Sequence, residues 1–205
     1  QAEENVLQHL KQLSQAVERQ EITDDDIPLI FLRVRHADQF AAFSSRLTAE
    51  KAKVLTGFVF PKFRSDNAGT YLAELRALNR RLGVFLYGMP ILEGREIAYR
   101  ETRTHELASL KQILVPYRDL ILNIRVGGTD FSSLFGVRRG IISSVFEILP
   151  VRDALSDILN FFNRMEDGYI VSGPVWEYFL ADSQHDLDHL LEQNLHRSLL
   201  TKEPI

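Results

Sequence analysis

Residues 54–60 read Val54-Leu55-Thr56-Gly57-Phe58-Val59-Phe60, a run that is almost continuously apolar rather than alternating. Strands buried on both faces have this pattern, and parallel sheets covered by helices are their usual source. The pattern therefore predicts a strand of a parallel sheet. Four further runs of this kind cover residues 29–35, 84–89, 120–126 and 169–172.

Segments with helical periodicity separate these five predicted strands. Repeated βα units of this kind predict an α/β fold with a parallel sheet. No low-complexity linker or shift in composition divides the chain, so residues 1–205 are expected to form a single domain ending in a C-terminal helix. The predicted helical segments are 4–19, 40–47, 71–78, 94–114, 151–164 and about 180–200.

The composition excludes several classes of function. The chain of 205 residues has a net charge of −4, without the basic excess that nucleic-acid or anionic-membrane binding requires. It contains no cysteine, so disulfides, thiolate nucleophiles and zinc–sulfur sites are excluded. No apolar run approaches the roughly 18 residues of a membrane span. We therefore expect a cytoplasmic protein that binds neither nucleic acid nor membrane.

Charged residues stand where the predicted strands end. Arg33 and Arg35 close the first strand, Lys62 follows the second, Glu93 the third and Asp130 the fourth. In parallel α/β folds these carboxyl ends meet on one face, where the active site forms. Two arginines, a lysine and two carboxylates at that face predict a pocket for a divalent metal and a polyanionic substrate.

Each of these residues also has a simpler explanation. An arginine at a strand end is often an ordinary surface charge. Glu93 could belong to the first turn of a helix that begins after Pro90, where the macrodipole favours an acid. Asp130 could be the N-cap of the following helix.

Three other features are interpreted structurally. The charges along residues 94–114 alternate in sign, which is typical of an exposed helix. His185 and His189 are expected on a solvated or interface face, and Trp176 is expected to pack in a core or between subunits. The alternating charges are Arg95, Glu96, Arg100, Glu101, Arg103 and Glu106, and the aromatic neighbours of Trp176 are Tyr178 and Phe179.

Four motifs between about residues 28 and 180 resemble those of the HpcH/HpaI-type aldolase and citrate-lyase β-subunit superfamily. Residues 87–96 and 171–179 are similar to one branch of it, the C–C bond lyase-like group encoded with tellurium-resistance and stress-response genes. The four motifs are Phe31-Leu32-Arg33-Val34-Arg35, Gly57-Phe58-Val59-Phe60-Pro61-Lys62, Pro90-Ile91-Leu92-Glu93 and Gly127-Gly128-Thr129-Asp130-Phe131, the last with Leu134 and Gly136.

The resemblance implies a (β/α)8 TIM barrel that is incomplete in this chain. The superfamily's first two strands, one of which ends in an acidic Asp-Leu-Glu-Asp motif, have no counterpart before residues 4–19. A late Gly-Lys…His-Pro strand in the C-terminal region is also missing. Position 35 is arginine where the superfamily commonly has asparagine, which suggests a more anionic substrate or an altered pocket.

The resemblance also implies roles for individual residues. Glu93 and Asp130 would ligate the metal, and carboxylate oxygens suit Mg²⁺. Arg33 would be catalytic and would clamp a substrate carboxylate. The other implied substrate-binding residues are Arg35, Lys62, Gly127 and Gly128.

The function expected from these observations is that of a Mg²⁺-dependent carbon–carbon lyase or aldolase. It would cleave a keto acid or an acyl thioester, such as a coenzyme A thioester, through a metal-stabilised enolate. A homo-oligomer, trimeric or hexameric, is expected by analogy. Two alternatives stay open: a non-catalytic barrel that binds a metabolite or partner in a stress-response system, and a phosphate-binding barrel enzyme similar to phosphoenolpyruvate mutase.

Overall fold

The computed structural model describes residues 1–137, 145–173, 183–189 and 192. The chain divides into two compact units. The N-terminal unit comprises residues 1–90 and 113–122, and the C-terminal unit comprises residues 91–112 and 123–205. All strand pairs of the described residues are parallel, in the order β1-β2-β3-β4-β5.

The N-terminal unit carries the first parallel ladder. Phe31 of β1 pairs with Gly57 of β2, which in turn pairs with Tyr87 of β3. An added Cβ on Gly57 would lie 2.1 Å from the Tyr87 carbonyl oxygen, so this position must be glycine for β2 to pair with β3. The elements are α1 (Ala2–Glu18), β1 (Phe31–Arg33), α2 (Ala37–Ser44), α3 (Ala49–Ala52), β2 (Gly57–Phe60), α4 (Ser65–Leu82) and β3 (Tyr87–Leu92), with the 3₁₀ segments Asp24–Asp26 and Val115–Leu120.

An aromatic cluster forms the core of this unit. Phe40 of α2 lies 4.8 Å from Phe58 and 5.2 Å from Phe60, measured between ring centroids. Phe60 stacks on Tyr71 of α4 at 4.6 Å. The apolar run at 54–60 thus meets aromatic residues of the helices before and after it, as a strand covered by helices should.

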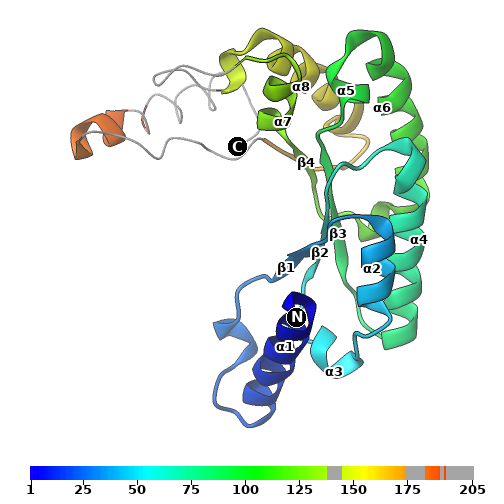
Figure 1. Cartoon of the computed structure of the whole chain (residues 1–205), viewed down its shortest axis with the longest axis vertical. Coiled ribbons are helices and arrows are strands. Elements are labelled where there is room, and N and C mark those ends of the chain that lie inside the picture. The colour runs from blue at the N-terminus through cyan, green and yellow to red at the C-terminus, as the bar shows by residue number, and fades with distance from the viewer. Residues whose placement is uncertain (138–144, 174–182, 190–191, 193–205) are drawn as a thin grey trace. The chain divides into compact units, whose positions relative to one another are not determined.

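The C-terminal unit continues the parallel pairing. The last two residues of β3, Ile91 and Leu92, pair with Arg125 and Val126 of β4, and Ile124 pairs with Val171 of β5. Figure 1 shows α5, α7 and α8 grouped beyond the end of β4. The elements are α5 (Arg95–Ala98), α6 (Arg100–Leu114), β4 (Ile124–Val126), α7 (Gly128–Leu134), the 3₁₀ segment Val145–Glu147, α8 (Leu149–Phe162) and β5 (Val171–Ser172).

Two predicted boundaries were wrong. Strand β3 runs on through Pro90 to Leu92, and no helix begins at Pro90. Glu93 therefore follows the strand directly and precedes Gly94, the N-cap of α5, so it is not in a helical first turn. The predicted helix 94–114 is two helices, because Tyr99 between them has extended backbone angles (φ −83°, ψ 131°).

Parts of the predicted C-terminal helix and all of Trp176, Tyr178 and Phe179 lie outside the described residues. Residues 184–189 are helical, and His185 and His189 are exposed there, as expected. No helix in the described part of the chain combines the length and apolarity needed to cross a membrane.

Candidate functional site

Glu93 is the buried carboxylate at the carboxyl end of β3, with 5% of its surface exposed. It immediately follows Leu92, whose carbonyl accepts a hydrogen bond from the Gly127 N–H at 3.0 Å. This bond ties the end of β3 to the residue that follows β4. The two strand ends therefore lie side by side within the C-terminal unit.

The ends of β3 and β4 approach each other most closely at Gly127. A Cβ placed on it would lie 2.5 Å from the Glu93 Cβ and 2.8 Å from the Glu93 Oε2. Its φ of −93° is open to any residue, so close approach rather than backbone conformation requires the glycine. The Glu93 carboxylate thus rests against a backbone position with no side chain.

Asp130 stands in the first turn of α7, three residues after Gly127. The N-cap is Gly127 itself, so the simpler interpretation of Asp130 as the cap is wrong. Its side chain is exposed, whereas Gly128 at the start of the helix is buried. The C-terminal unit therefore gathers Glu93, Gly127, Gly128 and Asp130 around adjacent ends of β3 and β4.

The cationic candidates belong to the N-terminal unit. Arg33 is the exposed last residue of β1, and Arg35 is exposed two residues later, where its N–H donates to Gln39 Oε1 at 2.6 Å. Lys62 is exposed after β2 and has a left-handed backbone with φ of 47°. That conformation costs a residue with a side chain about 1–2 kcal/mol, so the surroundings must hold it.

Sequence reasoning missed a buried arginine in the C-terminal unit. Arg103 was expected on an exposed, mixed-charge helix, yet only 2% of its surface is exposed, and Glu106 is also buried. The sequence pattern does predict burial of position 103, because this position falls on the same helical stripe as three buried leucines. These are Leu107, Leu110 and Leu114.

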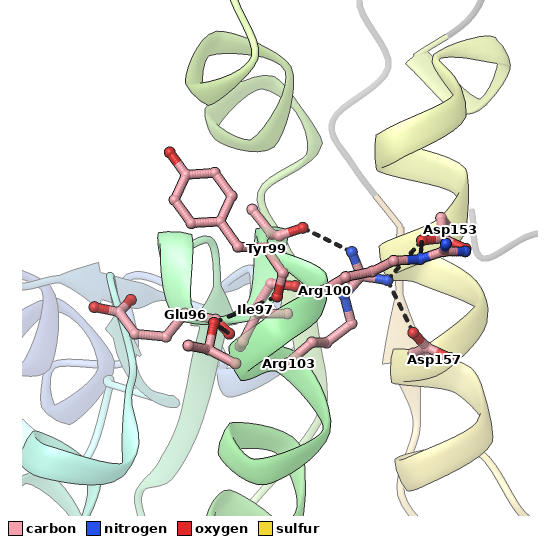
Figure 2. A network of polar contacts seen from close by, with 9 residues as sticks. Glu96, Ile97, Tyr99, Arg100, Arg103, Asp153 and Asp157 are labelled. Atoms are coloured by element: carbon pink, nitrogen blue, oxygen red, sulfur yellow. Dashed lines mark hydrogen bonds and ion pairs between the residues drawn. The ribbon is translucent and has the colours of Figure 1, made fainter.

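Each nitrogen of the Arg103 guanidinium donates to a neighbouring oxygen (Figure 2). Nε and Nη2 donate to the carbonyl oxygens of Ile97 and Ala98, both at 2.6 Å. Nη1 donates to Asp153 and Asp157 of α8, both at 2.9 Å. One side chain thereby joins the end of α5, the start of α6 and α8, so a buried charge is paired and hydrogen-bonded as burial demands.

The same network predicts a pH-dependent contribution to stability. Hydrogen bonds from Arg100 and then Arg103 hold the pKa of Asp153 below its usual value. A carboxyl whose pKa is lowered by folding stabilises the fold above its unfolded pKa, and this contribution is lost as pH falls through the folded pKa. We expect Asp153→Asn to lower the melting temperature at pH 7 and the deficit to shrink below about pH 4. Thermal melts from pH 7 to pH 3 measure this; a constant deficit would contradict it.

A family model described as C–C bond lyase of the TIM-barrel fold matches residues 1–204. The chain belongs to this C–C bond lyase family. The predicted TIM-barrel fold class is thereby confirmed, and so is the expectation of a family that acts on carbon–carbon bonds. No curated protein matches the sequence of this C–C bond lyase family member.

A solved structure of malate synthase from Haloferax volcanii has the same fold as this C–C bond lyase family member, with a TM-score of 0.58 at 13% sequence identity. The match covers 93% of this chain and 55% of the malate synthase chain. At that identity the likeness shows the TIM-barrel fold alone. The chain spans about half of the malate synthase, and its described residues supply five strands of the barrel.

Proposed function

We propose that this chain is a Mg²⁺-dependent carbon–carbon lyase acting on an anionic keto acid or acyl thioester. The observation that supports this most is the packing of buried Glu93 against Gly127, with Asp130 in the helical turn that follows. Membership of the C–C bond lyase family supports the class of reaction. The metal, the substrate class and the residue roles are the proposal.

The donor set fits magnesium. Within the described residues no group of three or more His, Cys, Asp or Glu is arranged to hold a metal. Mg²⁺ commonly takes only one or two carboxylates from a protein and leaves its other positions to water and substrate. Glu93 would be the buried, fixed ligand, and exposed Asp130 the ligand open to solvent and substrate. Bound there, Mg²⁺ would act as a Lewis acid toward negative charge developing on a substrate oxygen.

The remaining residues would bind and orient the substrate. Arg33 would hold a carboxylate through its planar guanidinium, which suits bidentate pairing. Lys62 and Arg35 are candidates for a second anionic group, such as the phosphates of a coenzyme A thioester. The Gly127 N–H already donates to the Leu92 carbonyl, so of the two glycines it is Gly128, in the first turn of α7, that would offer its N–H to a substrate oxygen.

Hydrogen exchange at the substrate carbon tests the proposal without knowledge of the full substrate. A lyase that forms a carbanion equivalent should exchange the methyl hydrogens of pyruvate or acetyl-coenzyme A in D₂O. We expect Mg²⁺-dependent loss of one of these methyl signals by NMR with the full-length protein. Exchange should slow at least about 100-fold in Glu93→Gln and Asp130→Asn.

The controls are the circular dichroism spectra of both variants and a reaction containing EDTA. If the wild-type protein exchanges the methyl hydrogens of neither pyruvate nor acetyl-coenzyme A, a catalytic role is contradicted and the non-catalytic binding barrel is favoured. Exchange that persists undiminished in both variants would contradict the assignment of Glu93 and Asp130.

A further inference from the structure

Arg125 places a charge in the middle of strand β4, inside the apolar run of residues 120–126. Its two neighbours in the strand, Ile124 and Val126, are buried, whereas Arg125 is half-buried. Side chains alternate between the two faces of a strand, so Arg125 lies on the face opposite to these neighbours. An arginine is rarely withdrawn from water unless it is paired, so its surroundings on that face matter.

The strand pairing places Arg125 on the same face as Glu93. Arg125 pairs with Ile91 of β3 and Ser172 of β5, and residues paired in register point to the same side of a sheet. Glu93 and Gly127 each follow two residues later, so the alternation brings both to this face. The approach of a Gly127 Cβ to within 2.5 Å of the Glu93 Cβ agrees with that. Two residues of strand span roughly 6.6 Å, which an arginine side chain can bridge.

The Arg125 guanidinium has no hydrogen bond or ion pair with any residue that the structure describes. The residues paired with it supply no carboxylate, because Ile91 is apolar and the Ser172 Oγ accepts from the Asn123 Nδ2 at 3.2 Å. A cation that is partly withdrawn from water without a partner is unfavourable. An anion bound on this face would supply the missing acceptors, and the planar guanidinium suits two parallel bonds to a carboxylate.

We propose that Arg125 is a substrate-binding residue that holds the carboxylate of a 2-oxo acid. Arg125, Glu93 and Asp130 all belong to the C-terminal unit, so their relation follows from pairing within that unit. A 2-oxo acid carries its carboxylate on the carbon next to its carbonyl, so one small molecule can meet both the metal site and Arg125. An acyl thioester has no carboxylate there. The inference rests on the proposed function and selects the keto acid from its two substrate classes.

The test is a calorimetric titration of pyruvate into the full-length protein at a fixed, saturating Mg²⁺ concentration. We expect Arg125→Met to weaken pyruvate binding about 10–100-fold, as loss of hydrogen bonds to a charged group does. Arg125→Lys should give an intermediate affinity, since lysine keeps the charge but lacks the planar fork. Methyl pyruvate, whose ester group is uncharged, should show no difference between the wild type and Arg125→Met.

Two further readouts separate substrate binding from a structural role. Arg125→Met removes a cation that has no partner among the described residues, so the melting temperature without pyruvate should not fall. Mg²⁺ affinity without pyruvate should not fall either, because the substitution removes a positive charge near the metal site. Arg152→Met is the matched control: Arg152 is an exposed arginine of α8 in the same unit, and its replacement should leave pyruvate binding unchanged.

The outcomes distinguish this inference from the proposed function. If the wild-type protein binds no pyruvate, the proposed keto-acid site is overturned and this inference with it. If the wild type binds pyruvate and Arg125→Met binds it equally well, the role of Arg125 alone is overturned. That role is also overturned if Arg125→Met lowers the melting temperature or the Mg²⁺ affinity, or weakens methyl pyruvate binding as much as pyruvate binding. Arg125 would then support the fold or the metal site instead of recognising a carboxylate.

Discussion

Gly127→Ala should weaken the proposed metal site while the rest of the protein stays folded. The new Cβ would fall 2.5 Å from the Glu93 Cβ and 2.8 Å from its Oε2, so the Glu93 side chain has to move. Overpacking of this kind costs about 1–3 kcal/mol of stability. A displaced ligand should weaken Mg²⁺ binding roughly 10–100-fold, the range seen when support of a metal ligand is lost. Calorimetric titration of Mg²⁺ and a thermal melt measure the two effects.

Gly69→Ala is the matched control for this change. Gly69 lies in helix α4, and a Cβ placed on it meets no atom within 4 Å. The substitution should raise stability by about 0.5–1 kcal/mol, because alanine is the better helix former, and leave Mg²⁺ binding unchanged. Unchanged Mg²⁺ affinity in Gly127→Ala would show that Glu93 is not a ligand or that its position is not set by Gly127.

Arg103→Met should strongly destabilise the C-terminal unit. The methionine would leave the carbonyl oxygens of Ile97 and Ala98 without their donor and separate Asp153 and Asp157 from their shared partner. Leaving a buried carbonyl oxygen without its donor costs about 1–3 kcal/mol, whereas Asp153 and Asp157, whose side chains are 38% and 46% exposed, stay partly solvated. Urea denaturation measures the loss, and Arg103→Lys, which keeps the charge but cannot reach all four acceptors, should give an intermediate value.

Arg100→Ala provides the comparison, because Arg100 shares the partner Asp153. Its Nε and Nη2 lie 3.0 and 3.1 Å from that carboxylate, but 80% of its side-chain surface is exposed. An ion pair so exposed contributes little to stability, because water and salt screen it. If Arg103→Met costs no more than Arg100→Ala, the buried bonds in Figure 2 do not carry the stability assigned to them.

The fold was predictable because the strand signal is strong and local. Continuous apolar runs such as residues 54–60 belong to strands buried on both faces, and such strands occur mainly in parallel α/β folds. Boundaries were less predictable. The apolar run predicts a strand over residues 84–89, yet β3 passes through Pro90 to Leu92. Sequence periodicity does not show which backbone N–H groups a sheet needs.

The candidate residues were predictable by type but not by environment. Sequence placed Glu93 and Asp130 at strand ends, and only coordinates show that Glu93 is buried and Asp130 exposed. The clash that makes Gly127 obligatory joins residues distant in sequence. The charge of Arg103 predicts exposure, whereas its position on the leucine stripe predicts burial. The structure shows burial, because an arginine with enough partners can occupy a buried face.

The most direct test of the central claim is a calorimetric titration of Mg²⁺ into the full-length protein, with and without pyruvate, repeated on Asp130→Ala. Asp130 is exposed in a helical first turn, so its replacement should cost at most about 1 kcal/mol and leave the fold intact. The account predicts one Mg²⁺ site that pyruvate tightens and that the substitution abolishes. Absence of Mg²⁺ binding in the wild type, or equal binding in Asp130→Ala, would contradict it.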